Sequence, residues 1–102
     1  MLTFIESPIF ARYVDDYLSE ESYTDLQWHL LAHPDAGDMI RGSGGVRKLR
    51  WAAKGKGKRG GVRVIYYWHT AQGEIWLLTL YAKNEAENIP TEILVKIREQ
   101  FE

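Results

Sequence analysis

Residues 62–83 read VRVIYYWHTAQGEIWLLTLYAK, two runs of β-branched and aromatic residues separated by Ala71-Gln72-Gly73. Runs of this kind around a glycine-bearing turn predict a β-hairpin, with strands at 62–69 and 74–83. A third run of the same character at 46–52 predicts a neighbouring strand. The centre of the chain is therefore expected to form an antiparallel sheet.

The residues before this centre have the apolar spacing of helices. Apolar side chains recur at i, i+3, i+4 and i+7 over 10–17, and the spacing repeats over 23–31. Ser7 and Ser19 precede these segments as candidate N-caps. The second helix should end before Pro34, because the residue ahead of a proline is pushed out of the helical region. Two acidic helices in tandem are expected.

A short apolar segment at 2–5 predicts an initial strand, and Pro90-Thr91 introduces a last helix with Ile93, Leu94, Ile97 and Phe101 on one side. The predicted order is β-α-α-β-β-β-α. It favours one α+β domain over residues 1–102, a small antiparallel-dominated sheet with helices on one face.

The composition argues against several classes of protein. The chain has 102 residues, no cysteine and a formal net charge of −1. Without cysteine there is no thiolate chemistry and no need for an oxidising compartment. No apolar run approaches ~18 residues, so no membrane span is expected. The first ten residues lack a basic n-region, so no signal peptide is expected either. These features predict a cytoplasmic protein.

The near-neutral charge conceals a strong asymmetry along the chain. Residues 1–38 carry eight acids and one base, a net charge of −7. Residues 39–83 carry ten bases and one acid, a net charge of +9, and residues 84–102 carry a net charge of −3. A basic segment of this size indicates an anionic partner such as nucleic acid, although segregated surface charges kept for solubility would look similar.

The loop KGKGKRGG at 54–61 is the most unusual stretch. It formally contains GxGxxG, but a strand follows it rather than a helix, which excludes a dinucleotide-binding loop. It also lacks the GxxxxGK[ST] pattern of a Walker A loop. A nuclear-localisation interpretation rests on composition alone. Its glycines allow close approach of backbone amides to an anion and its lysines supply charge, so contact with an RNA or DNA backbone is the favoured hypothesis.

Alternation along the predicted strands places further basic residues on one face. Lys48 and Arg50 point away from Arg47, and Arg63 lies on the side opposite Val62. Tyr81 and Lys83 share a side that is expected to lie opposite Leu78, Leu80 and Ala82. A basic surface built from Arg50, Arg63, Lys83 and the loop lysines is therefore possible. Tyr81 could stack on a base or present its hydroxyl to a phosphate.

The histidines do not predict a metal or catalytic site. His29 and His33 are four residues apart on the second helix, but no third ligand or HExxH pattern accompanies them. His69, at a strand end, has no recognisable partner. No cofactor is expected, so any chemistry would be carried by lysine, arginine and tyrosine.

Two segments can be compared with known families: GVRKLRWAAKGKGKRGGVRVIYYW at 45–68 and LLTLYAKNE at 77–85. Together with the opening FIESPIF at 4–10, they resemble the HigB/RelE branch of the RelE/ParE toxin superfamily. The similarity spans nearly the whole chain. It implies a RelE-like fold and a bacterial toxin of a toxin–antitoxin pair that cleaves mRNA in the ribosomal A site. In the reaction that it implies, the RNA 2′-hydroxyl attacks the adjacent phosphate without a metal.

The resemblance also implies roles for individual residues. Arg63 matches the arginine that holds the scissile phosphate, and Tyr81 and Lys83 match the end of the last strand, where further active-site groups lie. Lys54 and Lys56 match loop lysines that bind phosphate or transfer protons, and either is a candidate general base because neighbouring cations disfavour its charged form. The remaining basic residues are expected to bind RNA or the ribosome: Arg47, Lys48, Arg50, Lys58 and Arg59.

The sequence departs from RelE at two places. Asn84 stands where RelE has an arginine after its last strand, so Lys83 could substitute for it. Residues 85–89 contain no tyrosine to match the one in the RelE C-terminal helix, so Tyr81 could take that part, or no tyrosine acts.

Three functions therefore stay open: a ribosome-dependent mRNA endonuclease, a ParE-like inhibitor of DNA gyrase without catalysis, and a plain RNA-binding module. The expected partners are mRNA on the 30S A site with its rRNA, and an antitoxin encoded by an adjacent gene that carries a DNA-binding domain. Operator DNA would be reached only through the toxin–antitoxin complex, and no membrane partner is expected.

Overall fold

The structure is a computed structural model that describes residues 2–52, 61–83, 85 and 89–101. The helices and strands follow one another along the chain in this order: β1 (Thr3–Glu6), α1 (Pro8–Tyr17), α2 (Glu20–Ala32), β2 (Asp38–Met39), β3 (Val46–Trp51), β4 (Val62–His69), β5 (Glu74–Ala82) and α3 (Thr91–Glu99). The α+β class is confirmed, and the predicted order is confirmed except for one added strand, β2.

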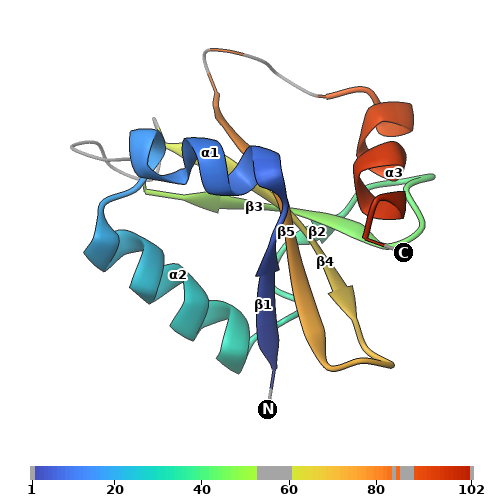
Figure 1. The fold of residues 1–102 in the computed structure, drawn as a ribbon, viewed down its shortest axis with the longest axis horizontal. Coiled ribbons are helices and arrows are strands. Elements are labelled where there is room, and N and C mark those ends of the chain that lie inside the picture. The colour runs from blue at the N-terminus through green and yellow to red at the C-terminus, as the bar shows by residue number, and fades with distance from the viewer. Residues whose placement is uncertain (1, 53–60, 84, 86–88, 102) are drawn as a thin grey trace.

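The strands form one mixed sheet in the order β1-β5-β4-β3-β2 (Figure 1). β1 pairs in parallel with β5, and every other pair is antiparallel. The hairpin predicted from residues 62–83 is confirmed, because β4 and β5 pair from Val62–Ala82 to His69–Glu74. Gly73 closes its turn with a φ of 63°, a conformation that glycine adopts without strain.

Both predicted serine caps are confirmed. The Ser7 Oγ accepts from the Phe10 N–H at 3.0 Å and donates to the Leu78 carbonyl at 2.6 Å, which ties the start of α1 to β5. The Ser19 Oγ accepts from the Ser22 N–H at 3.1 Å. α2 ends at Ala32, before Pro34, as predicted. No helix in the described ranges is long and apolar enough to cross a membrane.

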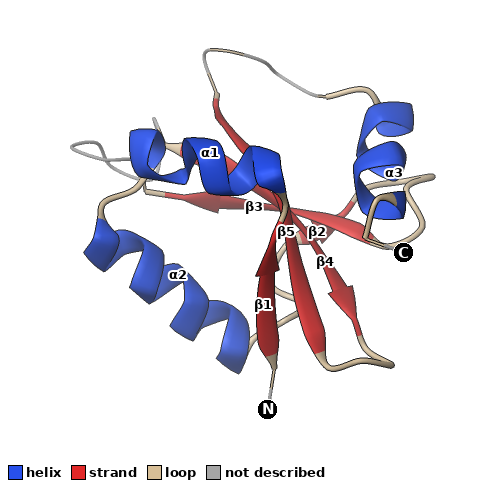
Figure 2. Ribbon diagram, in the orientation of Figure 1, coloured by secondary structure: helices blue, strands red, loops and turns tan. Residues whose placement is uncertain are grey.

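The helices cover both faces of the sheet, so the expectation that they share one face is wrong for α3 (Figure 2). The reason lies in β5, which is buried from Ile75 to Tyr81 and therefore needs a cover on each side. One core packs α1 and α2 against the sheet and includes Phe10, Leu26, Val64, Tyr66 and Leu77. The other packs α3 and includes Val46, Ile65, Leu78, Leu94 and Ile97.

A β-bulge in β5 changes the alternation that the sequence predicted. Ile65 pairs with Thr79 and Tyr66 with Leu77, which leaves Leu78 without an opposite residue. The extra residue shifts the alternation, so Leu78 lies on the α3 face together with Tyr81, while Leu80 lies on the other face. The expectation that Leu78 lies opposite Tyr81 is therefore wrong, because regular alternation does not continue through a bulge.

The loop after α2 is held against the α1–α2 face, and this places β2. The Tyr66 hydroxyl donates to the Pro34 carbonyl and accepts from the Gly37 N–H, both at 2.8 Å. The Arg47 Nη1 donates to the Gly37 carbonyl at 2.8 Å and to the Asp35 carbonyl at 3.2 Å. A Cβ at Gly37 would lie 2.9 Å from the Tyr66 ring, so glycine permits the close approach. The chain then continues into β2, where Asp38 pairs with Lys48.

Candidate nucleic-acid interface

Arg50, Arg63 and Tyr81 form a row across β3, β4 and β5. Arg63 pairs with Arg50 on one side and with Tyr81 on the other. Directly opposite residues in adjacent strands have their side chains on the same face, and Tyr81 packs in the core on the α3 side. Like charges placed opposite one another destabilise a sheet. The pairing of Arg50 with Arg63 therefore suits a surface that receives an anion.

Arg63 is the buried charged residue of the row. Its side chain is only 7% exposed, and its Nη1 has no hydrogen-bond partner among the described residues. A buried guanidinium with an unfilled donor is costly, and most such donors in proteins find a partner. A phosphate oxygen would supply the missing acceptor and a compensating charge. Arg63 thus has the environment of a phosphate-binding residue.

Tyr81 beside it is also 7% exposed. Burial raises the pKa of the Tyr81 phenol above its ordinary value of 10.0, and the positive charge of Arg63 opposes that shift. The phenol is therefore protonated at neutral pH and can donate a hydrogen bond. Because its ring is buried in the core on the α3 side, the hydroxyl is the part of Tyr81 suited to meet a phosphate, rather than a ring face for stacking.

The other predicted basic residues are placed differently. Arg50 is exposed, and Lys83 is exposed just beyond β5, where its N–H donates to the Gly61 carbonyl at 3.4 Å. Lys48 is half-buried on the same face, two residues along β3 from Arg50. Arg47 extends from β3 to the loop before β2 on the opposite side, where its guanidinium contacts carbonyl groups. The structure therefore does not bring Arg47 together with Arg63.

The predicted loop residues Lys54, Lys56, Lys58 and Arg59 lie outside the described residues. The described ends of β3 and β4 on either side of this segment are Trp51 and Val62, which pair with one another. That pair is next to the Arg50–Arg63 pair in the register. β3 therefore ends, and β4 begins, at the end of the sheet that carries Arg50 and Arg63.

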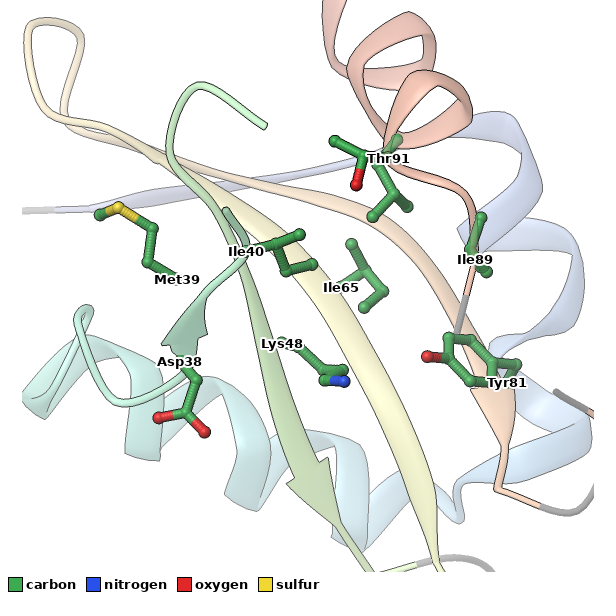
Figure 3. Close-up of a pocket in the computed structure, with 9 residues that line it drawn as sticks. Asp38, Met39, Ile40, Lys48, Ile65, Tyr81, Ile89 and Thr91 are labelled. Carbon is green, nitrogen blue, oxygen red and sulfur yellow. The ribbon is translucent and has the colours of Figure 1, made fainter. Parts of the chain in front are cut away.

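A pocket of about 330 Å³ opens on the same face, next to Tyr81 (Figure 3). Its polar lining includes Lys48, Tyr81 and Thr91, with Asp38 at its edge. Its walls are mainly aliphatic, from Ile40, Ile65, Ile89 and Leu94.

Sequence reasoning missed this pocket. Its residues lie in or next to β2, β3, β4, β5 and α3, and only the strand register and the position of α3 bring them together. Asp38 could have been placed opposite Lys48 only with knowledge of β2, a strand of two residues.

The histidines are part of aromatic packing. The His69 ring stacks on Trp76 with centroids 4.7 Å apart and planes at 11°, at the opposite end of β4 from Arg63. The His29 ring lies 5.3 Å from Trp51 and 5.5 Å from His33. Within the described part of the chain, no three His, Cys, Asp or Glu residues are grouped as metal ligands would be.

Comparison with solved structures shows which known fold this chain resembles. No family model matches the chain. Among solved structures, a doubly substituted mutant of the Escherichia coli toxin RelE in the free state is similar, with a TM-score of 0.63 and 13% sequence identity. The similarity covers 93% of this chain and 94% of the RelE chain. This small α+β domain, with its mixed five-stranded sheet, therefore has a RelE-like fold.

Proposed function

We propose that this protein is the toxin of a bacterial toxin–antitoxin pair of RelE type, and that it cleaves mRNA in the ribosomal A site. The observation that carries the proposal is Arg63, a buried guanidinium whose Nη1 has no hydrogen-bond partner among the residues that the structure describes. Arg63 pairs across the sheet with Arg50 and Tyr81. The RelE-like fold and the resemblance in segments 45–68 and 77–85 also support the proposal.

In the proposed reaction the RNA 2′-hydroxyl attacks the adjacent phosphorus. A base takes the 2′-hydroxyl proton, the bond from phosphorus to the 5′-oxygen breaks, and an acid protonates that oxygen. The products are a 2′,3′-cyclic phosphate and a 5′-hydroxyl. Arg63 holds the phosphate and stabilises the negative charge that develops on its oxygens, the kind of electrostatic contribution that typically gives ~10²–10³ in rate.

Tyr81 acts on the acid side of this reaction. Its raised pKa keeps the phenol protonated, so it donates to a phosphate oxygen or to the leaving 5′-oxygen rather than accepting the 2′-hydroxyl proton. The base is then assigned to Lys54 or Lys56 in the basic loop, and Lys83 adds positive charge at the end of β5. The remaining basic residues are proposed to bind RNA or rRNA: Arg47, Lys48, Arg50, Lys58 and Arg59. Of these, Arg50 pairs directly with Arg63 in the sheet.

The partner in the resting cell is proposed to be a separately encoded antitoxin from an adjacent gene. A surface that binds RNA through Arg50 and Arg63 must be covered or distorted to be silenced. Contact with operator DNA is assigned to the antitoxin, so the toxin reaches DNA only within the complex.

The direct test compares naked RNA with the same RNA on programmed ribosomes. The purified wild-type protein should leave naked RNA largely intact and cut the ribosome-bound mRNA in the A-site codon, with a 2′,3′-cyclic phosphate at the new 3′ end. Uncut mRNA on programmed ribosomes would contradict the proposal.

The two other functions predict different results, the first in cells that express the protein and the second in a binding assay. A gyrase inhibitor would arrest growth with intact mRNA and with gyrase-dependent DNA breaks. A plain RNA-binding module would bind RNA without cutting it, with log affinity falling by about 0.7 per phosphate contacted for each unit of log salt.

A further inference from the structure

We propose that the pocket beside Tyr81 is a base-recognition site, and that Lys48 makes it selective for a base with a keto oxygen, guanine best of all. The inference rests on the proposed function, since it places one base of the cleaved RNA in this pocket. The pocket's volume of about 330 Å³ is near the lower end of the ~300–1,000 Å³ of small-ligand sites, which suits a single base with part of its sugar.

The apolar lining of the pocket suits an aromatic ring. Its walls are formed by aliphatic side chains from three parts of the fold: Ile40 after β2, Ile65 on β4, and Ile89 just before α3 (Figure 3). Leu94 on α3 completes the lining. Ile65 and Leu94 are almost fully buried, so the two sides of the pocket are held by the core. Bases taken out of a stack are held between aromatic or apolar side chains while hydrogen bonds read their edges.

The polar groups of the pocket include one pure donor and, at the edge, one pure acceptor. The Lys48 ammonium can only donate, the Tyr81 and Thr91 hydroxyls can donate or accept, and the exposed Asp38 carboxylate at the edge can only accept. In Figure 3 the Lys48 ammonium and the Tyr81 hydroxyl are directed toward the space between them. Guanine presents two adjacent acceptors, O6 and N7, and lysine is among their common partners. Adenine instead places an amino donor beside N7, where the ammonium would oppose it.

The position of the pocket relative to Arg63 fits one nucleotide of a bound RNA. Lys48 pairs with Ile65, two residues along the strands from the Arg50–Arg63 pair and on the same face. Two residues of a strand span about 6.6 Å, comparable to the separation between the phosphate and the base of one nucleotide. An RNA with a phosphate at Arg63 can therefore place a neighbouring base in the pocket. This makes Lys48 a specificity-determining residue.

The test uses programmed ribosomes and a set of mRNAs that differ at one base of the A-site codon. At one position the wild-type protein should cut the guanine mRNA about 10-fold faster than the adenine mRNA, a modest value for the discrimination of one base contact. Lys48→Met should reduce that ratio to near one while it still cuts. Lys48→Arg should retain the preference, and Lys96→Met, an exposed lysine on α3, should match the wild type.

A second readout does not depend on cleavage. Guanosine monophosphate should shift the NMR methyl signals of Ile65, Ile89 and Leu94 more strongly than adenosine monophosphate does, and Lys48→Met should remove the difference. Cutting with the same base preference in wild type and Lys48→Met would overturn the assignment of Lys48 while the proposed nuclease function stands. If the wild type cuts no ribosome-bound mRNA, the proposed function fails. Whatever the result of the cleavage assay, the base-recognition pocket would be overturned if guanosine monophosphate shifted no methyl signals, or only those of residues outside the pocket.

Discussion

At the scale of single residues, the candidate site depends on two buried side chains that differ in charge. Arg63 brings a fixed positive charge into a buried position, and Tyr81 next to it is a neutral donor. Burial has opposite consequences for the two. It leaves the Arg63 Nη1 without a partner among the described residues, whereas it stabilises the protonated phenol of Tyr81.

The protonation state of Tyr81 gives a prediction with a defined pH dependence. Because its pKa is raised above 10.0, the neutral phenol persists from neutral pH to about pH 9, and a donor role is lost only at higher pH. Tyr81→Phe should lower the rate of ribosomal cleavage by about 10²-fold, and this ratio to the wild type should stay constant between about pH 7 and pH 9. Single-turnover cleavage rates across this range measure it.

Tyr13→Phe is the matched control, since Tyr13 is an exposed tyrosine on α1. It should cleave as the wild type does, with the same pH profile. A wild-type activity that rises with pH through a tyrosine titration absent from Tyr81→Phe would instead identify Tyr81 as a base.

At the scale of elements, a carboxylate ties the end of β5 to α1. The Glu85 Oε1 accepts from the Ala82 N–H at 2.8 Å and from the Tyr17 hydroxyl. The hydrogen bond from Tyr17 holds the pKa of Glu85 below its ordinary value. Burial and the contact with Glu85 raise the pKa of Tyr17 to about 12. The contact lies close in sequence to Tyr81 and Lys83, so it helps to fix the end of the strand that carries them.

These two shifts define the pH window in which the contact stabilises the fold. The lowered pKa of Glu85 contributes stability above its ordinary 4.5, lost as pH falls through the lower folded value. The raised pKa of Tyr17 contributes stability below its ordinary 10.0, lost as pH rises toward about 12. Glu85→Gln should therefore lower the Tm at pH 7, and the difference from wild type should shrink as the pH falls below about 4.5.

Thermal unfolding followed by circular dichroism between about pH 3 and pH 7 measures this window. Glu99→Gln, at an exposed position in the last turn of α3, should not lower the Tm at pH 7. An equal loss of Tm for Glu85→Gln at both ends of the range would show that the ionised carboxylate contributes nothing.

The elements also show which features local sequence patterns can predict. Serine caps, the proline after α2 and the glycine turn act within a few residues, so α1, α2 and the β4–β5 hairpin could be predicted. β2 and the bulge at Leu78 could not, because both exist only through pairing with a distant strand. The side on which α3 packs depends on β5 being buried on both faces, and a continuous apolar run does not specify which helix covers which face.

The candidate site was predictable to a similar degree. Strand alternation placed Lys48 and Arg50 on the same side of β3, and Arg50 was expected to share a surface with Arg63. The pairing of Arg50 with Arg63 in the structure agrees with this expectation. Strand alternation could not show that Arg63 is buried or that Arg47 extends to Asp35 and Gly37, since both follow from tertiary packing.

At the scale of the whole molecule, the two faces of the sheet differ in charge. The first 38 residues, which include α1 and α2, have a net charge of −7, and these helices cover the face opposite the Arg63 row. Residues 39–83 carry the net charge of +9 along the sheet and the basic loop. The net charge of −1 is therefore an average over different surfaces, and the acidic helices disfavour indiscriminate binding of RNA.

The central claim is that Arg63 is a phosphate-binding residue of a ribosome-dependent nuclease. Its most direct test is primer extension on a translated mRNA after induction of the wild type, Arg63→Ala, or the control Arg12→Ala, which removes an arginine from α1. The wild type and Arg12→Ala should produce the same cuts within A-site codons, and a folded Arg63→Ala should reduce them by about 10²-fold or more. Equal cutting by a folded Arg63→Ala, or intact mRNA with the wild type, would contradict the claim.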